Sequence, residues 1–88
     1  MQFLIHWEVK PEHRNQVLER FQSKQEDAHP GVKMLGAWHA VTQEEGWAVT
    51  EAEDLVELGK WLYQWTDLNV NHVTPVVNDA QMHEIVGT

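Results

Sequence analysis

Two strands joined by a short polar link are predicted by residues 32–50, VKMLGAWHAVTQEEGWAVT. The first strand runs from about Val32 to Val41, and the second covers Trp47–Thr50, where aromatic and β-branched residues are frequent. The polar link Thr42–Gly46 contains a glycine and is short enough for a hairpin. We therefore expect the two strands to pair, and we expect Gly36 to mark a β-bulge or a close backbone approach.

A strand and a helix are expected on each side of this hairpin. Pro11 suits the first turn of a helix, the dipeptide Pro30-Gly31 is typical of a turn, and Pro75 favours an edge strand because it cannot donate a ladder hydrogen bond. The expected elements are a strand at Phe3–Val9, a helix from about Pro11 to Gln25, the hairpin, a second helix from about Ala52 to Trp65, an edge strand at Leu68–Val77, and a short terminal helix at Asp79–Val86 after the N-cap Asn78.

The order β-α-β-β-α-β predicts an α+β fold of the ferredoxin-like type in a single domain, residues 1–88, with both helices on one face of an antiparallel sheet. Apolar residues fall on both alternating sets of the second strand, with Met34 and Trp38 on one side and Leu35 and Val41 on the other. A second copy packed sheet against sheet, as in a dimeric α+β barrel, would cover the remaining face. Three apolar residues of the terminal helix are expected to face inward: Met82, Ile85 and Val86.

Composition argues against a nucleic-acid-binding protein, a membrane-spanning protein and a secreted protein. Hydrophobic residues make up 42% of the 88 residues and the formal net charge is −8, with no basic face to bind nucleic acid. No apolar run approaches the roughly 20 residues of a membrane-spanning helix. Cysteine is absent and the first residues lack the pattern of a secretory signal, so we expect a cytoplasmic location and neither nucleic acid nor a membrane as partner.

Several short motifs carry a resemblance to a known family. They are Gly36-x-Trp38-His39, Trp65-x-Asp67-Leu68, Thr74-Pro75-Val76 and Lys10-Pro11-Glu12. Together they resemble a family of small bacterial proteins classed as a domain of unknown function, numbered 3303, over nearly the whole chain. That family is similar in fold to dimeric α+β barrels, whose relatives include cofactor-free monooxygenases, haem-handling enzymes and muconolactone isomerases. The resemblance implies the fold and no activity.

His39 is the candidate catalytic residue. It follows Trp38 and lies on the opposite side of the strand, where it would border a cavity against the second helix and act as a general base or orient a ligand. The structural alternative is a core histidine hydrogen-bonded to a backbone carbonyl or to Asp67. His6 is the second candidate, whereas His13, His29 and His83 are expected to be solvated.

The five tryptophans, Trp7, Trp38, Trp47, Trp61 and Trp65, have two interpretations. They could line a slot for a flat apolar ligand, or they could fill the core and a dimer interface. We select Trp38, Trp47 and Trp65 with His6 as candidate ligand-binding residues, and we expect Trp65 to be the most buried of the second helix.

No metal site or cofactor is expected. No helix carries a His-x-x-x-His pair, and although His6, His39 and His72 could share a sheet face, we favour roles for them as partly buried or surface polar groups. Two classes of function stay open. One is a homodimer that binds a small apolar or aromatic molecule, with cofactor-free monooxygenase or isomerase chemistry; the other is a non-enzymatic interaction or assembly module. A cavity containing His39 and a tryptophan would favour the binder, and a well-filled core would favour the module.

Overall fold

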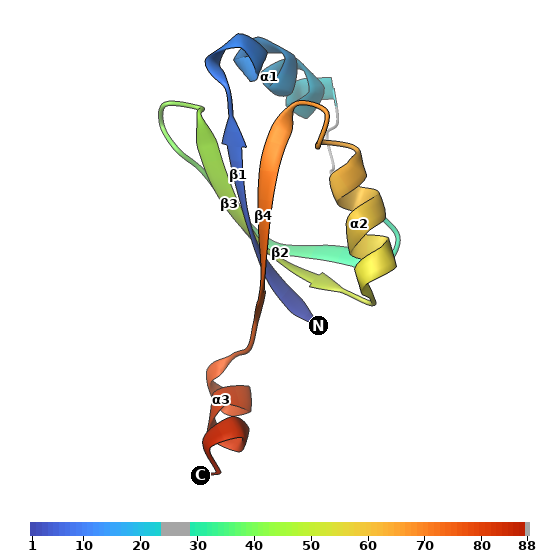
Figure 1. Ribbon diagram of the computed structural model, residues 1–88, viewed down its shortest axis with the longest axis vertical. Helices are drawn as coiled ribbons and strands as arrows, with labels where there is room; N and C mark the ends of the chain where they lie inside the picture. The colour runs from blue at the N-terminus through green and yellow to red at the C-terminus, as the bar shows by residue number, and fades with distance from the viewer. Residues whose placement is uncertain (24–28, 88) are drawn as a thin grey trace.

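The computed structural model describes residues 1–23 and 29–87, which form a four-stranded antiparallel sheet with three α-helices around it (Figure 1). The elements are β1 (Gln2–Val9), the 3-10 turn η1 (Pro11–His13), α1 (Arg14–Ser23), β2 (Val32–His39), β3 (Glu45–Ala52), α2 (Leu55–Tyr63), β4 (Asn69–Val76) and α3 (Asp79–Val86). The strand order β2-β3-β1-β4 confirms the α+β, ferredoxin-like prediction and the edge position of the strand that contains Pro75.

The helices differ from the predicted ranges at their ends. Pro11 begins a 3-10 turn before α1, and the predicted end of that helix at Gln25 lies outside the described residues. Helix α2 begins after Asp54, whose side chain accepts a hydrogen bond from the Glu57 N–H at 2.8 Å, because Ala52 is still paired in β3. Within the described ranges no helix is long and apolar enough to cross a membrane.

The loop between β2 and β3 begins and ends earlier in the sequence than the predicted link Thr42–Gly46, because β2 ends at His39 and β3 begins at Glu45. Ala40 N donates to Glu45 O at 2.9 Å, so pairing reaches further along the hairpin and Gly46 lies in β3 instead of in the loop. The β-bulge predicted at Gly36 is confirmed, since the register shifts between Met34 and Gly36. This extra residue reverses the alternation, so the prediction that Met34 and Trp38 share a face is wrong.

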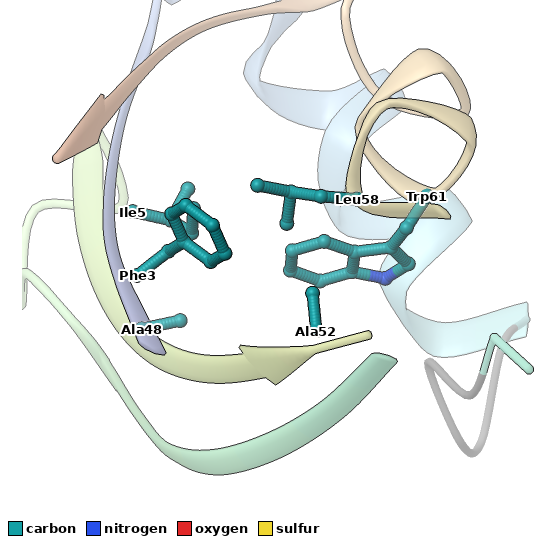
Figure 2. Packing of buried hydrophobic residues seen from close by; sticks show 6 residues of the cluster. All are labelled: Phe3, Ile5, Ala48, Ala52, Leu58 and Trp61. Atoms are coloured by element: carbon teal, nitrogen blue, oxygen red, sulfur yellow. The ribbon is translucent and has the colours of Figure 1, made fainter. Parts of the chain in front are cut away.

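The core lies between α2 and one face of the sheet (Figure 2). Leu58 and Trp61 project from α2 toward residues of β1 and β3, and Trp61 is only 4% exposed. The buried cluster consists of Phe3, Ile5, Ala48, Ala52, Leu58 and Trp61. The expectation that Trp65 would be more buried than Trp61 is wrong. Helix α2 ends at Tyr63, so Trp65 falls in the following turn, where its backbone N–H donates to the Leu62 carbonyl oxygen at 2.9 Å.

The sheet therefore has two distinct sides. We call the face toward α2 and the core the helix side and the other face the open side. Helix α1 lies beyond the end of the sheet reached by β1, and α3 lies beyond the opposite end, away from the core (Figure 1). The prediction that Met82, Ile85 and Val86 face inward is wrong, because all three are exposed.

Candidate functional site

One residue from each strand lines up across the end of the sheet nearest α1. On the helix side this row contains His39, Gly46, Trp7 and Asn71, which are successive register partners. The neighbouring residues form a matching row on the open side: Trp38, Trp47, His6 and His72. Three histidines and three tryptophans thus lie in these two neighbouring rows, which face opposite sides of the sheet.

The helix-side row is built around the ring of Trp7. This ring lies against Gly46, where a β-carbon would come within 2.1 Å of Trp7 Cζ2. The His39 ring meets Trp7 edge-on at 5.4 Å and Phe21 of α1 at 5.2 Å between ring centroids. His39 thus lies opposite Trp38, as expected, but it faces α1 instead of α2.

Two asparagines of β4 add polar groups to the same side. Asn71 is the register partner of Trp7, and Asn69 is the partner of Val9. Asn69 is only 8% exposed, and its Oδ1 and the Nδ2 of Asn71 are buried with no hydrogen-bond partner among the described residues. A buried amide atom without a partner costs about 1–3 kcal/mol relative to a satisfied one, so these atoms indicate a place for a further polar group.

The open-side row is a continuous contact of flat rings. His6 stacks on Trp47 at 5.2 Å with an interplanar angle of 5°, and on its other side meets His72 at 5.7 Å. His6 Nε2 lies 2.9 Å from Oε1 of Glu45, and His72 Nε2 lies 3.4 Å from Oε2 of Glu8. Trp38 completes the row and is 60% exposed, so a broad aromatic surface faces away from the helices.

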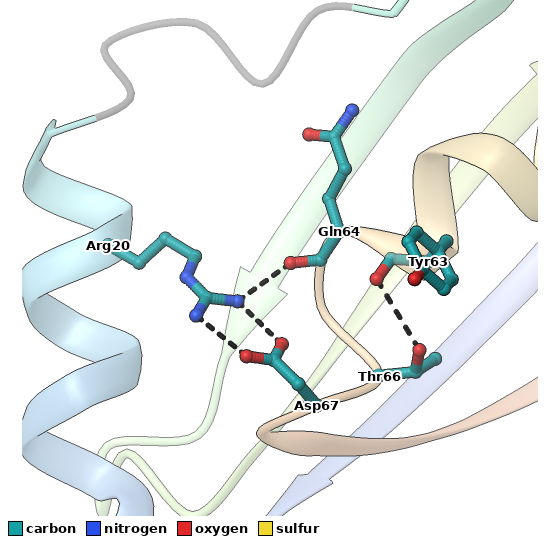
Figure 3. A network of polar contacts seen from close by, with 5 residues as sticks. All are labelled: Arg20, Tyr63, Gln64, Thr66 and Asp67. Atoms are coloured by element: carbon teal, nitrogen blue, oxygen red, sulfur yellow. Dashed lines mark hydrogen bonds and ion pairs between the residues drawn. The ribbon is translucent and has the colours of Figure 1, made fainter.

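Helix α1 is tied to the turn before β4 by a charged pair (Figure 3). Arg20 donates two hydrogen bonds to Asp67 at 2.7 and 2.9 Å and a third to the Gln64 carbonyl at 2.7 Å. These bonds lower the pKa of the Asp67 carboxyl and raise the pKa of the Arg20 guanidinium. The guanidinium also lies 5.7 Å from the ring centre of Trp65. Asp67 is thus held by Arg20, not by His39.

The predicted site residues lie in three separate places. The structure brings His6, Trp38 and Trp47 together on the open side, and it places His39 on the helix side with Trp7 and Phe21. Trp65 lies apart from both groups, beside Arg20. The other histidines differ too: His29, expected to be solvated, has a side chain only 15% exposed, with Nε2 3.1 Å from Oε2 of Glu57.

The sequence analysis did not single out Asn69 and Asn71. The pattern that could have indicated them is the alternation Asn-x-Asn-x-Val at 69–73, which puts both amides on the same side of the strand as an apolar residue.

The three histidines considered for a metal site do not share a face of the sheet. His39 lies on the helix side, whereas His6 and His72 lie on the open side. Within the described part of the chain no three His, Asp or Glu side chains are grouped to hold a metal ion.

The two best-formed hollows lie elsewhere and are open to solvent. One, of about 370 Å³, lies where β2 begins and β3 ends, and is lined by Met1, Gly31, Val32, Lys33, Glu51, Ala52 and Glu53. The other, of about 500 Å³, lies beside the Arg20–Asp67 pair and is lined by Gln16, Glu19, Arg20, Ser23, Asp67 and Leu68. Neither includes His39 or a tryptophan.

Comparison with known proteins gives a family and several solved structures of similar fold. No curated protein matches the chain. One matching solved structure is a protein from Deinococcus radiodurans whose name suggests an antibiotic biosynthesis monooxygenase, at 9% identity and a TM-score of 0.43, covering 89% of this chain and 94% of that chain. The family model described as a domain of unknown function, DUF3303, matches residues 1–88, and the chain therefore belongs to that family.

Proposed function

We propose that this domain is a homodimer that binds a small aromatic molecule between α1 and the helix side of the sheet. The observation that carries the proposal is the pair of buried amide atoms, Asn69 Oδ1 and Asn71 Nδ2, which have no partner within residues 1–23 and 29–87 and lie on the strand next to Trp7. Small-molecule sites combine apolar walls with a few convergent polar groups. An aromatic ligand with a hydroxyl or carbonyl group would satisfy one of the amides and pack against Trp7 and Phe21.

His39 supports a catalytic extension of this role. Its ring touches both Trp7 and Phe21, so a ligand held by these two side chains would lie within reach of the imidazole. A neutral imidazole there would accept the proton of a phenolic hydroxyl, which is general-base chemistry that needs no cofactor. Cofactor-free oxidation by molecular oxygen and isomerisation are reaction classes that can begin with such a proton transfer.

The homodimer is supported by the open side. An exposed aromatic row there is flanked by the apolar side chains of Leu4 and Val49, which are register partners on β1 and β3. Large aromatic residues are enriched at the centre of protein interfaces. We therefore propose that His6, Trp38 and Trp47 serve the contact between the two copies.

The second candidate function is a non-enzymatic assembly module. It is favoured by the position of the two best-formed hollows, neither of which contains His39 or a tryptophan. In this alternative a water molecule satisfies the asparagine amides, and the aromatic row serves assembly alone.

A thermal-shift experiment with a panel of small phenols and quinones separates the two functions. A ligand that binds only the folded protein raises the melting temperature by mass action, so we expect at least one member of the panel to stabilise the wild type. Asn71→Leu should abolish that shift while leaving the unliganded protein at least as stable as the wild type, because the substitution removes a buried Nδ2 that makes no bond to the described residues. His39→Ala should reduce the shift more than it reduces stability.

The matched control is His72→Leu, the neighbouring residue on the opposite side of the same strand. This variant should keep the ligand response of the wild type. If no member of the panel stabilises any of these proteins, ligand binding is wrong and the assembly module takes its place.

A further inference from the structure

Helix α3 has well-formed ends. The Asn78 side chain accepts a hydrogen bond from Gln81 N at 2.8 Å, and the Gln81 side chain accepts one from Asn78 N at 2.9 Å, which completes a capping box. At the other end Gly87 adopts a left-handed conformation with φ 81°, typical of a helix C-cap. The sequence of this segment therefore encodes a helix with definite ends.

The apolar face of this helix is not covered by the described part of the chain, residues 1–23 and 29–87. Every residue from Asp79 to Val86 is exposed, and the apolar ones remain so, with Met82 at 47%, Ile85 at 67% and Val86 at 62%. A helix of eight residues is not stable alone in water, because nucleation is costly and most helical stability in proteins comes from packing an apolar face. The apolar face of α3 therefore needs a surface from another molecule.

The dimensions of the chain indicate how large that surface is. The radius of gyration is 14.4 Å, whereas a compact chain of this length would have about 12 Å. The exposed area is 6291 Å², whereas a compact monomer of 10.3 kDa would expose about 5,400 Å². The excess is close to the roughly 800 Å² that each partner buries in a standard interface.

We infer that α3 is an exchanged arm, which packs its apolar face onto a second copy of this chain. This inference rests on the homodimer proposed above. The arm follows directly on β4, the edge strand that borders the open side, so a copy seated on that side lies next to the arm. Two-fold symmetry lets each copy give its arm and receive the other's, which covers both apolar faces at once.

Charge argues against a lipid surface as the occupant. Asp79 and Glu84 lie on α3, and the helix has no Lys or Arg to attract anionic headgroups. Amphipathic helices that lie on membranes carry basic residues on their polar face. A second copy needs no such charge.

The test compares two variants of α3 by sedimentation equilibrium. Ile85→Asp should raise the dimer dissociation constant at least tenfold, because a carboxylate would be placed in the covered apolar face. Glu84→Gln, the adjacent residue, should leave the constant unchanged. A chain ending at residue 77 keeps every core residue and the open-side row, so it should stay folded by circular dichroism and raise the dimer dissociation constant at least as much as Ile85→Asp.

The outcomes distinguish this inference from the proposed function. A monomeric wild type contradicts the homodimer and the arm together. A dimeric wild type whose dissociation constant is unchanged in Ile85→Asp and in the shortened chain contradicts the arm alone. Binding of the wild type to anionic vesicles that Ile85→Asp loses, with an unchanged dimer, would assign α3 to a membrane surface and overturn the inference.

Discussion

Gly46 shows how one residue shapes the candidate site. It lies in β3 beneath the Trp7 ring, and a β-carbon there would also come within 2.9 Å of the Trp38 carbonyl oxygen. The absence of a side chain lets Trp7 lie across the strand and reach the His39 ring. The wall of the proposed ligand site therefore depends on a glycine that contacts no ligand.

Gly46→Ala should destabilise the fold by about 1–3 kcal/mol, because the added methyl group forces the Trp7 ring off its position. Urea unfolding followed by Trp fluorescence measures this difference. Gly59→Ala is the matched control: a β-carbon at Gly59 in α2 meets nothing within 4 Å, so the substitution should stabilise by about 0.5–1 kcal/mol. Equal effects of the two substitutions would contradict the role of Gly46.

At the scale of elements, α1 depends on polar contacts more than on burial. Phe21 is 52% exposed and no residue of α1 is buried, so the three hydrogen bonds from Arg20 to Asp67 and Gln64 are its main link to the turn before β4 (Figure 3). An exposed pair of this kind contributes little to global stability. Its effect is local, on the position of the helix over the proposed site.

Asp67→Asn should loosen α1 in a pH-dependent way. The folded pKa of Asp67 lies below its unfolded value, so the pair stabilises the fold above about pH 4 and loses that contribution as pH falls through the lowered pKa. Hydrogen exchange of α1 amides should therefore be faster in the variant than in the wild type at pH 7, with the difference vanishing in acid. A difference that persists below pH 2 would show that the carboxylate charge is not involved.

For the whole molecule, the division of apolar surface is the main feature. One side of the sheet is covered by α2, and the other side and α3 are left to a second copy in our proposal (Figure 1). A domain of this size buries only about 60–65% of its unfolded surface, so the dimer that we propose would add to its stability.

The melting temperature should therefore rise with protein concentration. Each tenfold increase adds about 1.4 kcal/mol to the free energy of unfolding the dimer, because dissociation is coupled to unfolding. Calorimetry from micromolar to millimolar concentration measures the trend. A melting temperature independent of concentration, with the mass of one chain in light scattering, would show that the single chain is sufficient.

Much of the fold was predictable because its signals are local. Pro11, the Pro30-Gly31 turn and the Asn78 cap each act through a few neighbouring atoms, and the structure places a boundary or turn at each. The α+β order of elements follows from these signals together with strand and helix periodicity. Within the candidate site, the placement of His39 opposite Trp38 followed from the same alternation.

The sequence by itself thus determined the elements, their order and the sheet edge occupied by Pro75, since these depend on backbone torsion, capping and periodicity. Tertiary structure decided the rest. The bulge beside Gly36 moved Met34 and Trp38 to opposite faces, and the end of α2 at Tyr63 made Trp61 the core residue in place of Trp65. Burial depends on which distant segments meet, and in our proposal the environment of α3 depends on a second copy. Local sequence patterns carry no information on which distant segments meet or on what surrounds α3.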